Sequence, residues 1–201
     1  PAFKIRGRKS PLALTVGILV IIGALFTALS GFYADWLWFK SVDFTSTWST
    51  ILGTKIFLFV VTGLLTAAIV LANVWIAYKR RPLYVPMTME SDNLERYRSQ
   101  VEPIRRSLFI GGFLALFYFA GTSGSTLWSS WLLFKNSTDF GVKDPQFNMD
   151  ISFFAFRLPF WQTVIGWGIS TLVLAIIASA VVHYLYGGIR LQVQEDRTTV
   201  A

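Results

Sequence analysis

Residues 160–184 read FWQTVIGWGISTLVLAIIASAVVHY, a run of apolar residues that contains no Asp, Glu, Lys or Arg. Three further stretches share this property, residues 12–33, 56–78 and 108–128. The core of a bilayer needs about 20 apolar residues per helix, whereas a soluble helix of that length carries a charged face. The sequence therefore predicts an all-α fold, a polytopic transmembrane helical bundle with four spans.

The positive charge of the chain is distributed unevenly around these stretches. The formal net charge is +7, and thirteen of the 18 basic residues lie before the first stretch, between the second and third, or after the fourth. Cytoplasmic segments of membrane proteins carry such an excess of Lys and Arg. We therefore expect both ends of the chain to be cytoplasmic, and no nucleic-acid partner, because no aromatic and basic platform accompanies the charge.

The spans divide the chain into eight segments. They are residues 1–33, the basic end and first span; 34–55, an external aromatic loop; 56–78, the second span; 79–107, a cytoplasmic loop; 108–128, the third span; 129–159, an external loop; 160–184, the fourth span; and 185–201, a cytoplasmic tail.

Aromatic and basic residues flank the spans at the depths where lipid headgroups begin. Trp, Tyr and Phe gather in this layer, and Lys and Arg contact anionic headgroups. The predicted interface anchors are Trp36, Trp38, Lys40, Trp131, Lys135, Phe153 and Phe154. The predicted headgroup and topology residues are Lys79, Arg80, Arg81, Arg105 and Arg106.

A short motif occurs twice. Residues 36–40 read WLWFK and residues 131–135 read WLLFK, and an Asp-Phe pair follows each. Both copies follow a span that begins in the cytoplasm, so a duplication would relate the two helix pairs by an axis along the membrane normal. The alternative is chance similarity between two aromatic segments at the membrane surface.

The predicted cytoplasmic loop contains a short amphipathic helix. Leu94, Tyr97, Val101 and Ile104 recur at helical spacing, and Pro103 is expected to bend or end the helix. Two interpretations remain open, a helix that lies on the membrane surface and a docking site for a cytoplasmic partner.

Polar residues with possible chemistry are few. Asn73 needs hydrogen-bond partners and is expected to face another helix, and His183 lies near the inner end of its span. Small residues four apart predict close helix packing in four places: Gly63 with Ala67, Gly111 with Ala115, Gly166 with Ser170, and Ala175 with Ser179. The segment 121–125, GTSGS, is not a G-x-S-x-G nucleophile motif.

One external cluster could bind a cation. It consists of Asp139, Asp144, Asn148 and Asp150, but its spacing is not that of an EF-hand, and a solvated turn is favoured over a Ca²⁺ site. The chain also has no cysteine. We therefore expect no catalytic, metal-binding or cofactor-binding residue, and no enzyme activity.

Several segments resemble the uncharacterised protein family 0182, a family of large bacterial membrane proteins. They are residues 35–39 (DWLWF), 94–98 (LERYR) with 101–103 (VEP), and 140–147 (FGVKDPQF) with 150–153 (DISF). The resemblance implies a multi-pass protein of the bacterial plasma membrane, of which this chain is the amino-terminal portion. Further helices and a large extracytoplasmic region would follow it.

Two functions compete on this basis, and a membrane enzyme ranks third behind them. The first is a membrane anchor or scaffold, which carries an external domain and associates with the lipid bilayer, with anionic headgroups and with other membrane protein subunits. The second is a transporter or lipid-handling protein whose pathway lies partly outside this chain. The absence of an ionisable residue from the span centres favours the first, because ion paths usually need one.

Overall fold

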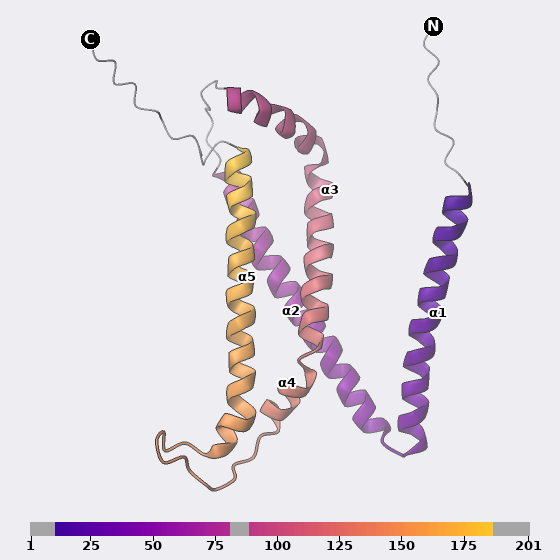
Figure 1. Ribbon diagram of the computed structural model, residues 1–201, viewed down its shortest axis with the longest axis vertical. Helices are drawn as coiled ribbons and strands as arrows, with labels where there is room; N and C mark the ends of the chain where they lie inside the picture. The colour runs from indigo at the N-terminus through magenta and orange to yellow at the C-terminus, as the bar shows by residue number, and fades with distance from the viewer. Residues whose placement is uncertain (1–10, 81–88, 187–201) are drawn as a thin grey trace. The chain divides into compact units, whose positions relative to one another are not determined.

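The computed structural model describes residues 11–80 and 89–186, and nearly all of them are helical. Figure 1 shows the helices as they follow one another along the chain. They are α1 (Pro11–Ser41), α2 (Thr45–Lys79), α3 (Met89–Ser125), α4 (Trp128–Lys135), a short π-helical segment η1 (Phe153–Arg157) and α5 (Leu158–Leu185). Residues 136–150 form the one long loop of the described ranges.

Four helical segments are long and apolar enough to cross a membrane. They are Leu14–Ser41, Thr45–Lys79, Ser99–Ser125 and Phe153–Leu185. Each one exceeds the length of about 20 residues that a bilayer core requires. The prediction of an all-α fold with four potential spans is thereby confirmed.

The chain divides into two units, Pro1–Leu52 and Gly53–Ala201. In the first, α1 connects to the start of α2 through residues 42–44, and Asp43 takes a left-handed conformation with φ 64°. The ring of Phe32 on α1 lies edge-on to that of Trp48 on α2, with their centroids 5.1 Å apart. A single tight turn and one aromatic contact thus join these two helices.

In the second unit, α2 and α3 approach so closely that three glycines are required. A Cβ added to Gly63 would lie 2.6 Å from the backbone oxygen of Phe117, and one added to Gly121 would lie 2.9 Å from that of Phe59. At Gly124 the same atom would collide with the side chain of Thr62. Small residues at helix crossings let the backbones approach closely, and the resulting van der Waals packing is one of the forces that associate helices in lipid.

Polar side chains add hydrogen bonds to this helix packing. Thr62 donates from Oγ1 to the carbonyl oxygen of Ala120 at 3.0 Å, across the crossing of α2 and α3. Between α2 and α5, Trp167 donates from Nε1 to Thr66 Oγ1 at 3.1 Å, and the hydroxyl oxygens of Thr66 and Thr171 are 3.5 Å apart. Thr66 and Thr171 are buried, so these groups satisfy one another away from solvent.

The four predicted small-residue pairs divide evenly. Gly63, Ala67 and Ala175 are buried, and the Oγ of Ser179 is inaccessible, so these two pairs lie in packed regions. The other two pairs are exposed in their unit, and a Cβ on Gly111 or Gly166 would meet nothing within 4 Å. The prediction of close packing is wrong for these two pairs within the described part of the unit.

The predicted short amphipathic helix and the third span are not separated by a loop. The short amphipathic helix and the span are one helix, α3, with Pro103 inside it. Figure 1 shows the first part of α3 inclined to the rest. Proline lacks the N–H that continues the hydrogen-bond ladder, so a bend is its usual effect. The helix continues past Pro103, so the alternative that Pro103 ends it is wrong, and the inclination of its first part (Figure 1) agrees with the expected bend.

Candidate functional site

An aromatic cluster joins three helices at one end of the second unit. Trp131 of α4 lies 5.7 Å from Phe57 of α2 and 5.5 Å from Phe160 of α5, measured between ring centroids. Phe134 stacks on Phe160 at 4.3 Å and meets Trp161 at 5.9 Å. Each such pair stabilises by about 0.5–1.5 kcal/mol beyond its buried area. Trp131, predicted as a membrane-interface anchor, therefore also connects helices.

The equivalent residues of the first motif copy have a simpler environment. Trp36 stacks with Tyr33 of its own helix at 5.7 Å, and the Lys40 ammonium lies 4.9 Å from its ring. Trp38 is exposed and lies edge-on to Phe39. Both copies end a helix, but α1 is continuous through its copy, whereas residues 126–127 separate α4 from α3.

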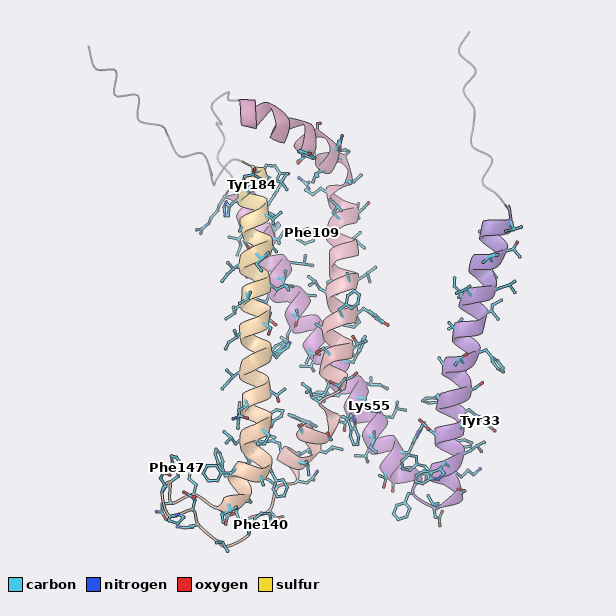
Figure 2. All side chains as sticks on the ribbon, viewed as in Figure 1. Tyr33, Lys55, Phe109, Phe140, Phe147 and Tyr184 are labelled. Carbon is cyan, nitrogen blue, oxygen red and sulfur yellow. The ribbon has the colours of Figure 1, made fainter. Side chains whose placement is uncertain are left out.

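The remaining predicted anchors lie beside the long loop. Lys135 is the exposed last residue of α4. Phe153 and Phe154 are half-buried in η1, where Phe154 lies 5.8 Å from Phe147 of the loop. Figure 2 shows Phe140 and Phe147 at the loop end of the unit, and Tyr184 at the opposite end of α5.

At that opposite end a polar cluster, which we call the Glu102 cluster, connects three helices. Glu102 of α3 accepts hydrogen bonds from the hydroxyl of Tyr78 on α2 at 2.7 Å and from that of Tyr186, which follows α5, at 2.9 Å. Arg105 donates to Glu102 at 3.1 Å, hydrogen-bonds the Tyr78 hydroxyl and lies over the Tyr78 ring. One carboxylate thus holds groups from α2, α3 and the end of α5.

The predicted headgroup residues have different surroundings. Arg105 belongs to the Glu102 cluster, whereas the Lys79 ammonium lies 4.0 Å from the ring centre of Trp75. Arg80 and Arg106 are exposed. Arg81 lies outside the described residues.

In the long loop, acidic side chains bind the loop's own backbone. Asp150 accepts hydrogen bonds from the N–H groups of Phe140, Gly141 and Ser152 at 2.8–3.0 Å. Asp144 accepts in the same way from the N–H groups of Gln146 and Phe147. Two of the three carboxylates of the predicted cation cluster, those of Asp144 and Asp150, thus stabilise the loop backbone, as carboxylates in Asx turns do.

A second set of contacts attaches this loop to η1. Arg157 donates from Nε to Ser137 Oγ at 3.0 Å, and its guanidinium lies 3.7 Å from Asp139. The hydroxyl of Ser152, a residue that is 1% exposed, is 3.3 Å from Asp139 Oδ1. In the described ranges no group of three or more His, Cys, Asp or Glu is placed to hold a metal ion.

The hydrogen bonds to Asp150 predict a pH dependence of the loop. The Ser152 hydroxyl, followed by the backbone N–H groups of Ser152 and Phe140, lowers the pKa of Asp150 from 3.8 to about 2. A lowered pKa in the folded state stabilises the fold above the unfolded value, and this stabilisation is lost as the pH falls. We expect the loop to be protected above about pH 4, and less so between pH 4 and 2.

Hydrogen exchange of residues 139–152, corrected for intrinsic rates, measures this effect. Asp150→Asn is expected to reduce the pH dependence and to exchange faster at pH 6, whereas Asp35→Asn in α1 serves as a control. Equal exchange of the native protein and Asp150→Asn at pH 6 would contradict the role of Asp150.

Sequence patterns did not identify the Glu102 cluster. Tyr78, Glu102 and Tyr186 are far apart in the chain, and their meeting depends on how α2, α3 and α5 pack. The one available signal is that Glu102 lies close to the start of the third span, and that Tyr78 and Tyr186 lie at the same end of the second and fourth spans. His183 is half-buried near this end of α5.

Comparison with known proteins gives one consistent result. The model of an uncharacterised protein family, UPF0182, matches residues 12–201. A UPF0182 protein of Streptomyces coelicolor is 43% identical over 96% of this chain, and one of Salinispora arenicola is 43% identical over 100% of it. A third, from Thermobifida fusca, is 42% identical over 96% of the chain. No solved structure matches the chain.

These relatives are much longer than this chain. The matched region covers 19% of the Streptomyces protein and 20% of the Salinispora protein. The chain therefore spans about a fifth of the length of the curated relatives that it matches.

Proposed function

Because this chain belongs to the uncharacterised protein family UPF0182, and has four helices that could cross a membrane, we propose that it is a membrane anchor and scaffold. In this role the helices hold the rest of a longer protein at a bacterial plasma membrane. They also bind neighbouring membrane subunits.

One observation supports this proposal above the others. At both ends of the second unit, and between them, side chains join helices to one another: the aromatic cluster around Trp131, the contacts of Thr66, and the Glu102 cluster. Catalytic and transport sites instead direct polar groups towards a substrate. An assembly built around mutual helix contacts fits a structural role.

The test uses the full-length protein in the membrane of its own host. The protein is extracted in a mild detergent and purified, and copurifying proteins are identified and quantified by mass spectrometry. The proposal expects at least one membrane protein in a fixed ratio. An isolated protein that carries out ion or lipid flux in vesicles would instead favour transport.

The topology of the scaffold is a separate prediction. The excess of thirteen basic residues on one side over five on the other supports a cytoplasmic location for both ends of this chain, under the positive-inside rule. A single cysteine at Ser91 is expected to resist an impermeant thiol reagent in intact cells, whereas one at exposed Thr138 is expected to react. Thr138 is preferred to Ser137 because Ser137 binds Arg157. The opposite labelling pattern would reverse the topology.

A further inference from the structure

Asn73 presents an amide on the outside of the second unit. It lies in the span Thr45–Lys79, yet its side chain is exposed and not directed into the packing of α2 against α3 or α5. Its Nδ2 donates to the carbonyl oxygen of Ile69 one turn earlier, at 2.8 Å. The sequence predicts that Asn73 faces another helix, and this prediction is wrong for the helices of its own unit.

The depth of Asn73 makes this exposure costly. It lies six residues before Lys79, which corresponds to about 9 Å along a helix axis that rises 1.5 Å per residue. The flanking stretch, residues 56–78, contains no charged residue. Lipid tails offer no hydrogen-bond donor to the amide oxygen, so polar side chains at this depth usually bind a neighbouring helix.

The residues around Asn73 fit such a neighbour. Ala68 and Ala72, four residues apart, are exposed on the adjoining surface, as are Leu65 and Ile76. Two small residues one turn apart permit close approach of a second backbone, and the amide then supplies a directional hydrogen bond. We call Leu65, Ala68, Ala72, Asn73 and Ile76 the Asn73 face.

We propose that the Asn73 face binds a transmembrane helix from the part of the longer protein that lies outside this chain. About four-fifths of the length of the relatives lies outside the matched region, since the match covers 19–20% of them. A helix is the expected occupant because its backbone satisfies its own hydrogen bonds in lipid. This inference deepens the proposed scaffold role by naming one docking surface and its partner.

The chemistry defines what the partner helix must contain. It carries a hydrogen-bond donor, such as Ser, Thr, Asn, Gln or Trp, at the depth of the Asn73 amide oxygen. It also carries small or flat apolar residues opposite Ala68 and Ala72.

Photo-crosslinking in the full-length protein tests the proposal. A benzophenone amino acid replaces Ile76 on the Asn73 face or, as a matched control, Ile177, an exposed isoleucine of α5. After irradiation of native membranes, the crosslinked peptides are identified by mass spectrometry. Ile76 is expected to crosslink to a transmembrane segment outside residues 1–201, and Ile177 is expected to crosslink to that segment much less.

Two substitutions test the contribution of the face itself. Asn73→Leu is expected to lower the equilibrium constant for docking of the partner helix about threefold, the fold-change that corresponds to an average interhelical hydrogen bond in a membrane, and so to lower the yield of the Ile76 crosslink. Ala72→Leu is expected to lower it through steric exclusion. Neither substitution changes the contact of Gly63 with Phe117. We therefore expect both variants to unfold in detergent at the same temperature as the native protein.

Other outcomes overturn the proposal. Crosslinks from Ile76 to α1, to a second copy of the protein or to lipid alone would each assign a different neighbour. An undiminished crosslink in Asn73→Leu would remove the amide from the interface. Because the crosslink is within one chain, it can succeed where copurification finds no partner subunit, and the two proposals can therefore fail independently.

Discussion

Gly63→Ala is expected to destabilise the protein by about 1–3 kcal/mol, the usual cost of overfilling a packed interior. The new methyl group would lie 2.6 Å from the backbone oxygen of Phe117, which cannot rotate away as a side chain would. In an open helix position the same substitution usually stabilises by about 0.5–1 kcal/mol. The crossing of α2 and α3 therefore reverses the sign of the effect.

Gly111→Ala is the matched control, because a Cβ there meets nothing within 4 Å in the second unit. Thermal unfolding of both variants in the same detergent gives the comparison. Gly63→Ala should melt earlier than the native protein, and Gly111→Ala at the same temperature or later. A neutral or stabilising Gly63→Ala would show that the two helices are farther apart than described.

Trp131→Ala is expected to cost about 2–3 kcal/mol, somewhat less than the 3–5 kcal/mol typical of fully buried aromatic residues, because Trp131 is half-buried. The substitution removes ring contacts with Phe57, Phe134 and Phe160, and so loosens α4 from α2 and α5. Trp131→Phe should retain most of the stability.

Trp36→Ala provides the comparison within the repeated motif. Its described partners, Tyr33 and Lys40, lie on the same helix, so we expect a loss of about 1 kcal/mol. The melting temperatures of the two alanine variants measure the difference. Equal losses would mean that the two copies are energetically equivalent, as a simple duplication would suggest.

The sequence predicted those parts of the fold that depend on local composition. Charge-free stretches identify the potential spans, because an ionised side chain is costly in lipid. This cost does not depend on which helices the span packs against. Trp131 and Lys135 could likewise be placed near a helix end from the aromatic and basic residues around them. These signals lie within one segment of chain.

Properties that depend on two segments could not be predicted in this way. Gly121 and Gly124 lie in the segment 121–125, which the sequence analysis considered only as a nucleophile motif and rejected. In the structure these glycines leave room for Phe59 and Thr62 of α2. Gly111 and Ala115 have the same small-residue spacing and remain exposed. Spacing indicates that close approach is possible, but the crossing geometry decides where it occurs.

The position of Pro103 illustrates a related difficulty. Proline disfavours the helical interior by about 3 kcal/mol, so local propensity suggested a possible break between loop and span. The helix nevertheless continues through Pro103. Glu102, the residue before the proline, is bound by tyrosines of α2 and of the end of α5.

The continuity of α3 has a mechanical consequence. A helix that passes through Pro103 without a loop is a continuous, bent rod. The hydrogen bonds of the Glu102 cluster attach it, next to Pro103, to α2 and to the end of α5. A force applied to the part of α3 before Pro103 is therefore transmitted as a torque to the part that can cross the membrane. No slack linker intervenes within α3 to absorb that force.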